Sequence, residues 1–99
     1  MPEMQFTVEW PDGVRTSHYS PSLVVHDFLV TGERYPVEDF VSRTREALDI
    51  ASERVRAAYG FACTSAAASQ AEIARAADGH GTGEVVVLAM EPPLPAVPA

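Results

Sequence analysis

The sequence contains one cysteine, Cys63, and no lysine. A single thiol cannot form a disulfide within the chain, so the fold must depend on a packed core, and a reducing cytoplasmic location is expected. No apolar run reaches ten residues, whereas a membrane-spanning helix needs about 20. The beginning of the sequence also lacks the charged start and apolar stretch of a secretory signal. A cytoplasmic protein without a membrane segment is therefore predicted.

Positive charge is scarce. Seven arginines accompany fourteen acidic residues, which gives a formal net charge of −7 at pH 7. Binding to nucleic acid or to an anionic membrane requires clustered basic side chains that neutralise phosphate groups. Neither class of partner is expected for this chain.

The length and composition indicate one folded domain. A chain of 99 residues with 46% hydrophobic side chains is long enough for a single core and too short for two. Four prolines occur among the last nine residues, a composition that favours an extended tail. We therefore predict a single domain over residues 1–90 and a flexible proline-rich tail over 91–99.

A β-hairpin is the clearest local feature. Residues 5–10 alternate between polar and apolar side chains, which is the pattern of a half-buried strand. The Pro-Asp-Gly sequence at 11–13 combines residues that favour a chain reversal. A second strand is therefore predicted over 14–19.

Three segments carry helix signals. Ser20 and Pro21 provide a hydroxyl N-cap and a first-turn proline, so a short helix is predicted over 20–29. Over 36–59 apolar side chains recur at three and four residues, which predicts an amphipathic helix that ends at the following glycine. A third, alanine-rich helix is predicted over 64–76.

The last predicted element is a strand over residues 84–90, where β-branched side chains are frequent. The complete order is ββαααβ, an α+β fold. We expect a three-stranded antiparallel or mixed sheet, made of the N-terminal hairpin and the C-terminal strand, with three helices packed on one face. The last strand is expected to lie beside the first. The two sheet edges make a homodimer a reasonable expectation.

The start of the third predicted helix is the main candidate for chemistry. Cys63 lies where free amides and the positive end of the helix dipole would favour a thiolate. Thr64 and Ser65 amides would stabilise an anion there, and His18 or Tyr19 would approach from the hairpin. The alternative is structural: unpaired cysteines are often buried as small apolar side chains, and both hydroxyls can serve as helix caps.

Other possible sites are not supported by their spacing. His18, His26 and His80 are too far apart in sequence to form a ligand pair on one helix, so no metal is expected. The glycine-rich segment 78–83 lacks the lysine and the preceding strand of a phosphate-binding loop. No cofactor is therefore predicted.

Four segments resemble a small bacterial family, the nitrogen starvation response proteins. The segments are FTVEWPDG (6–13), YSPS (19–22), ASERV (51–55) and YGFACTS (59–65). Members are typically encoded beside a nitrilase, a radical-SAM enzyme, a flavin-dependent oxidoreductase and an acetyltransferase. The resemblance implies a cytoplasmic accessory role in a nitrogen or nitrile pathway, with such enzymes as partners. Cys63 matches the family pattern, whereas His18 stands where many members have cysteine.

The leading hypothesis is a noncatalytic accessory or binding subunit that acts through protein contacts. The alternative is a small enzyme or ligand carrier in which Cys63 is the catalytic thiolate. Candidate ligand-binding or partner-binding residues come from the hairpin and from the segment before the third helix. They are Trp10, His18, Tyr19, Ser20, Tyr59, Thr64 and Ser65.

Overall fold

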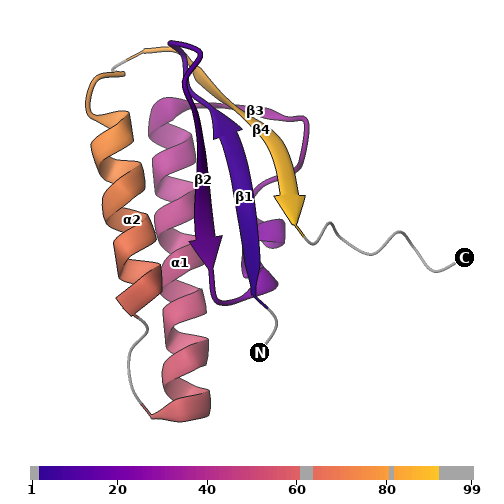
Figure 1. The fold of residues 1–99 in the computed structure, drawn as a ribbon, viewed down its shortest axis with the longest axis vertical. Coiled ribbons are helices and arrows are strands. Elements are labelled where there is room, and N and C mark those ends of the chain that lie inside the picture. The colour runs from indigo at the N-terminus through magenta and orange to yellow at the C-terminus, as the bar shows by residue number, and fades with distance from the viewer. Residues whose placement is uncertain (1–2, 61–63, 81, 92–99) are drawn as a thin grey trace, which may run out of the picture.

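The computed structural model describes residues 3–60, 64–80 and 82–91. It has an α+β fold in which two α-helices cover one face of a four-stranded antiparallel sheet (Figure 1). The elements are β1 (Met4–Glu9), β2 (Arg15–Ser20), the 3-10 helix η1 (Leu23–Asp27), β3 (Arg34–Pro36), α1 (Val37–Tyr59), α2 (Thr64–Ala77) and β4 (Glu84–Glu91). The strand order in the sheet is β2-β1-β4-β3.

The predicted hairpin is confirmed. β1 and β2 pair antiparallel, and the amide of Gly13 donates to the carbonyl of Trp10 at 2.8 Å to close the turn. The side chain of Asp12 accepts from the amide of Val14 at 3.1 Å, and Gly13 has a φ of 88°. The turn thus uses both properties expected of this sequence, an aspartate that bonds nearby backbone and a glycine in the left-handed region.

The last strand lies beside the first, as predicted, and runs antiparallel to it. The register shifts between Thr7 and Val8, so Leu88 is an extra residue on β4. This bulge changes the alternation of side chains along the strand. As a result Val87 and Met90, three positions apart, are both buried.

The predicted count of three strands and three helices is wrong in detail. Within the segment 20–29, where an α-helix was predicted, the helix is the short 3-10 helix η1 (Leu23–Asp27), and its N-cap is Ser22, whose hydroxyl accepts from the amide of Val24. Ser20 instead ends β2. A further strand, β3, pairs with β4. Its three residues are too few to show an alternating pattern, so only their place beside β4 makes them a strand.

The long helix α1 begins and ends as predicted. Glu38 and Asp39 occupy its first turn, and Gly60 caps its end with a φ of 82°. The predicted apolar stripe is buried as far as Val55. Tyr59, predicted to continue the stripe, is 56% exposed, because the last turns of α1 run past the end of the sheet (Figure 1).

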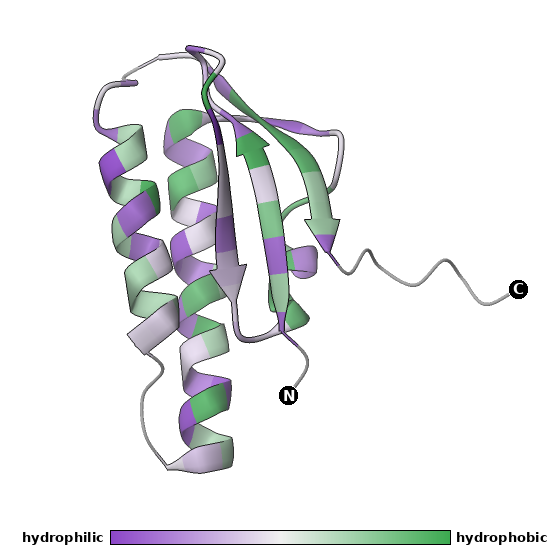
Figure 2. Cartoon of the chain, viewed as in Figure 1, coloured by the Kyte–Doolittle hydropathy of each residue, from purple (hydrophilic) through white to green (hydrophobic). Residues whose placement is uncertain are grey.

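The core lies between the sheet and the two α-helices. Figure 2 shows hydrophobic residues alternating with hydrophilic ones along β1 and around both helices. Fully buried side chains come from every layer, among them Phe6, Val8, Phe40, Leu48, Ile73, Val85 and Val87. None of the helices in the described part of the chain is long and apolar enough to cross a membrane. The predicted tail, apart from Glu91 at the end of β4, lies outside the described residues.

Candidate functional site

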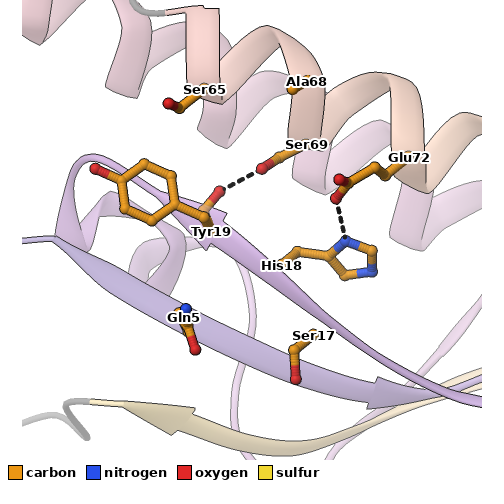
Figure 3. A pocket seen from close by; sticks show the side chains of 8 residues that line it. All are labelled: Gln5, Ser17, His18, Tyr19, Ser65, Ala68, Ser69 and Glu72. Atoms are coloured by element: carbon orange, nitrogen blue, oxygen red, sulfur yellow. Dashed lines mark hydrogen bonds and ion pairs between the residues drawn. The ribbon is translucent and has the colours of Figure 1, made fainter.

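An open groove runs between the edge strand β2 and helix α2 (Figure 3). Its volume is about 320 Å³. Side chains from three elements line it: Gln5 from β1; Ser17, His18 and Tyr19 from β2; and Ser65, Ala68, Ser69 and Glu72 from α2. Residues far apart in the sequence therefore meet here, next to the helix start that the sequence singled out.

Helix α2 is held against β2 by its small and apolar face. Ala66, Ser69 and Ile73 are its buried residues, and their spacing of three and four places them on one side of the helix. The hydroxyl of Ser69, which is 3% exposed, donates to the backbone carbonyl of Tyr19 at 2.7 Å. β2 has a sheet neighbour on one side only and is therefore an edge strand. The hydrogen bond from Ser69 thus joins α2 to the edge of the sheet.

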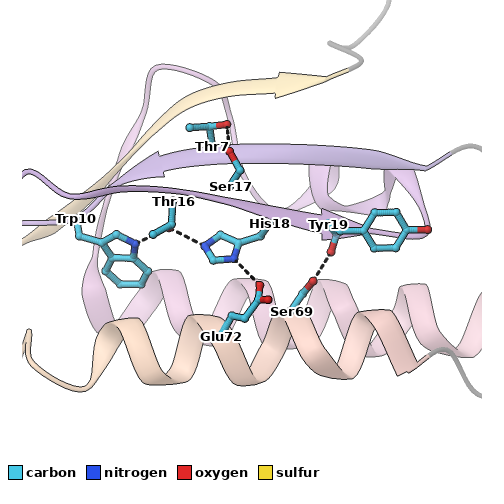
Figure 4. A network of polar contacts seen from close by, with 8 residues as sticks. All are labelled: Thr7, Trp10, Thr16, Ser17, His18, Tyr19, Ser69 and Glu72. Atoms are coloured by element: carbon cyan, nitrogen blue, oxygen red, sulfur yellow. Dashed lines mark hydrogen bonds and ion pairs between the residues drawn. The ribbon is translucent and has the colours of Figure 1, made fainter.

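A chain of polar contacts crosses from the core to the groove (Figure 4). The indole Nε1 of Trp10 donates to Thr16 Oγ1 at 2.8 Å, and Thr16 Oγ1 lies 2.8 Å from Nε2 of His18. On the other side of the ring, His18 Nδ1 lies 3.3 Å from Glu72 Oε1.

Only one set of proton positions satisfies the whole chain with a neutral imidazole. The indole nitrogen can only donate, so the hydroxyl of Thr16 accepts from it and is free to donate to Nε2 of His18. Nδ1 then carries the hydrogen and donates to the carboxylate of Glu72. His18 is 4% exposed, and burial lowers its pKa below the ordinary value of 6.5 even though the hydrogen bond and charge of Glu72 act in the opposite direction.

The order carboxylate, imidazole, hydroxyl matches the arrangement that activates a hydrolase nucleophile. The position of Thr16 does not match, because Thr16 is not part of the groove lining. Thr16 Oγ1 also accepts the hydrogen bond of Trp10, and this bond makes the hydroxyl oxygen less basic. The chain of contacts therefore orients His18 and Glu72, and the half-exposed carboxylate of Glu72 and the exposed Ser65 are the polar groups that α2 presents to the groove.

Three of the predicted site residues meet in this groove. His18 and Tyr19 line it from the hairpin, and Ser65 lines it from the first turn of α2. The hydroxyl of Tyr19 donates to Glu3 at 2.9 Å at the outer end of the strand. The hairpin thus lies beside the first turn of α2. Cys63, the predicted catalytic residue, lies outside the described residues, so its reactivity stays a prediction.

The other predicted residues lie elsewhere. Trp10 is in the core, where it packs edge-on against Phe40 and stacks on His80. Ser20 is buried, and its hydroxyl donates to the carbonyl of Ser22. Tyr59 and Thr64 are exposed on either side of the connection between the two α-helices.

Sequence reasoning missed Ser69 and Glu72. The spacing of Ser69 from Ile73 places both on one helix face, a signal that Ser69 would point toward the sheet. Glu72 is the sole acidic residue of α2, but nothing local indicates that it would reach His18. Among the described residues, no group of three or more histidine, cysteine, aspartate or glutamate side chains could hold a metal ion.

Comparison with known proteins supports the family seen in the sequence segments. Neither the curated proteins nor the solved structures gave a match. The family model described as nitrogen starvation-induced protein NitG matches residues 5–90, which include all of the described sheet except its outermost residues. The chain belongs to the nitrogen starvation-induced protein NitG family.

Proposed function

We propose that this protein is a noncatalytic binding subunit in nitrogen-related metabolism, and that it docks to a partner protein through the outer face of its sheet. The family description, nitrogen starvation-induced protein, supports the metabolic setting. The observation that carries the docking role is the composition of the sheet face opposite the helices.

The outer face has an uncharged centre. Thr7 and Ser17 are paired across β1 and β2, and their hydroxyls lie 2.7 Å apart. On the other side of β1, Ala89 is the partner of Thr7. Val86 on β4 is the register partner of Glu9 and of Arg34. These small side chains give the centre of the face a weakly polar surface without charge.

Charged side chains of both signs surround this centre. Glu9 and Arg15 form an ion pair of 3.1 Å at one end, Arg34 lies on the far strand, and Glu91 lies opposite Gln5 at the other end. Protein interfaces typically have a centre depleted of charge and a polar, charged rim. The face of this sheet has that arrangement, and the described helices leave it uncovered (Figure 1).

The partner class is proposed from the family setting. The neighbours expected from the resemblance are a nitrilase, a radical-SAM enzyme and a flavin enzyme, and a cytoplasmic accessory subunit would contact one of them. A second copy of this chain is the competing occupant of the same face. The alternative function is that of an enzyme with Cys63 as its thiolate nucleophile, and Cys63 lies outside the described residues.

The test is capture of partners from nitrogen-limited cells with tagged protein. Ala89→Arg places a charge at the centre of the outer face, and Ala67→Arg places the same charge on an exposed position of α2. We expect a pathway enzyme to be retained by the wild type and by Ala67→Arg, and to be lost with Ala89→Arg. Equal capture by both variants would show that the face is not the docking surface. Capture of this chain alone would identify a homodimer instead.

A further inference from the structure

We propose that the groove between β2 and α2 binds a small organic cation, a primary alkylammonium or amidinium compound whose charged group is held by the carboxylate of Glu72. The groove adjoins the outer sheet face and shares Gln5 and Ser17 with it, but Glu72 lies on α2, away from that face, so the proposal adds ligand binding to the proposed docking role.

The charge of the groove selects the class of ligand. Among the described residues that line it, Glu72 is the one carboxylate, and none is arginine. Burial keeps the pKa of His18 below its ordinary value although the hydrogen bond and the charge of Glu72 raise it, so the ring adds little positive charge near neutral pH. The formal charge of the whole chain, −7, has the same sign. An anion would be repelled, whereas a cation would be attracted.

Glu72 is arranged to accept a second hydrogen bond. Its Oε1 contacts Nδ1 of His18, and its side chain is 50% exposed. Figure 3 shows the other carboxylate oxygen directed away from the imidazole. An ionised carboxylate has about four acceptor positions, so the His18 contact leaves the group able to bind an N–H donor. The same contact fixes the orientation of the carboxylate before a ligand arrives.

The remaining lining groups suit a donor-rich cation. Ser65 and Gln5 provide neutral oxygen atoms that can accept N–H bonds. The ring of Tyr19 lies at the opposite end of the groove from Glu72 (Figure 3), where it can contact the organic part of a ligand whose charged group is bound to the carboxylate. An apolar ligand would leave the carboxylate and hydroxyls without partners, which costs free energy.

The size of the groove limits the ligand. A volume of about 320 Å³ is at the lower end of the range seen for small-molecule sites, roughly 300–1,000 Å³. A metabolite of a few carbon and nitrogen atoms fits this space better than a peptide or a nucleotide.

The test uses the full chain and simple probes. ¹⁵N-labelled protein is titrated with propylammonium and acetamidinium chlorides, and sodium propionate and sodium chloride serve as controls for charge sign and ionic strength. With the two cations we expect saturable chemical-shift changes at the backbone amides of Ser17, His18, Ser65, Ser69 and Glu72. With the two control salts we expect no saturable chemical-shift changes at these amides.

Two variants separate binding from structure. Glu72→Gln keeps an oxygen for His18 Nδ1 but removes the charge, and it should weaken cation binding by at least about tenfold. Glu46→Gln removes a charge from an exposed position of α1 outside the groove and should leave affinity unchanged. Shifts that never saturate, equal affinity in Glu72→Gln, or equal binding of propionate would each overturn the proposal and leave the His18–Glu72 contact as a purely structural tether.

Discussion

At the scale of single residues, His18 shows how a histidine can be important for structure before any ligand is considered. Its ring is buried against Phe6, with the ring centroids 5.5 Å apart, and both nitrogens have partners. Burial without such partners would leave polar atoms unsatisfied at a cost of about 1–3 kcal/mol each. Among the described side chains, no buried polar atom lacks a partner.

His18 should make folding stability depend on pH. Its pKa is lowered in the folded protein relative to 6.5, so the unfolded chain takes up a proton first as the pH falls. The stabilising contribution is therefore complete above pH 6.5 and is lost as the pH drops from 6.5 toward the folded pKa. Urea unfolding on both sides of this window should show a larger loss of unfolding free energy for the wild type than for His18→Gln.

The variant supplies the control for that measurement, because all other titrating groups are shared. Identical losses of stability in the two proteins would mean that the protonation of His18 is the same in the folded and unfolded states. That result would contradict a lowered pKa of His18 in the folded protein.

At the scale of elements, the packing of α2 on β2 decides whether the groove exists. α2 brings little apolar area to the core, since much of its sequence is alanine, and Ile73 is its one large buried side chain. Polar contacts with β2 therefore contribute more to holding α2 in place than such contacts usually do for a surface helix. The bond from the buried Ser69 to the carbonyl of Tyr19 is one of them.

Ser69→Ala should loosen α2. The substitution removes the donor to the carbonyl of Tyr19, and a buried hydrogen bond of this kind contributes about 0.5–1.5 kcal/mol to stability. We expect a loss of about 1 kcal/mol in unfolding free energy and faster amide exchange in α2 than in α1. Ser42→Ala, at an exposed position of α1, is the matched control and should change little. A neutral Ser69→Ala would show that Ile73 and Ala66 suffice to hold the helix.

At the scale of the whole molecule, the distribution of charge determines which classes of partner the protein can bind. Arginines on α1 are accompanied by acids: Arg43 pairs with Asp39 at 2.8 Å, and Arg56 with Glu53 at 3.7 Å. No basic stripe therefore forms on this helix, although several arginines lie on it. The excess of acidic residues is spread over the molecule.

The protein should not bind polyanions. On a heparin column near pH 7 and at about 0.1 M salt, where charges are screened beyond about 10 Å, we expect it in the flow-through because its formal net charge is −7. On an anion exchanger it should be retained under the same conditions. Retention on heparin would point to a local basic surface and would reopen nucleic-acid binding as a function.

Local features could be predicted from the sequence because they depend on neighbouring residues. The turn at Asp12 and Gly13, the end of α1 at Gly60, and the strand that became β4 all follow from side-chain chemistry within a few positions. The pairing of β4 with β1 was also expected, since an apolar strand needs a place in the sheet. These features define the α+β class and one helix-covered face.

Tertiary structure alone decided the remainder. β3 is a strand because residues 34–36 pass the free edge of β4, and the 3-10 helix at 23–27 replaces a predicted α-helix. The contact of His18 with Glu72 spans 54 residues, and no local pattern encodes a contact at that distance. It requires β2 at the sheet edge and α2 packed beside it. The sequence by itself therefore determined the hairpin, the two α-helices and β4, because their patterns are local, whereas the packing of the elements determined β3 and which side chains share a groove.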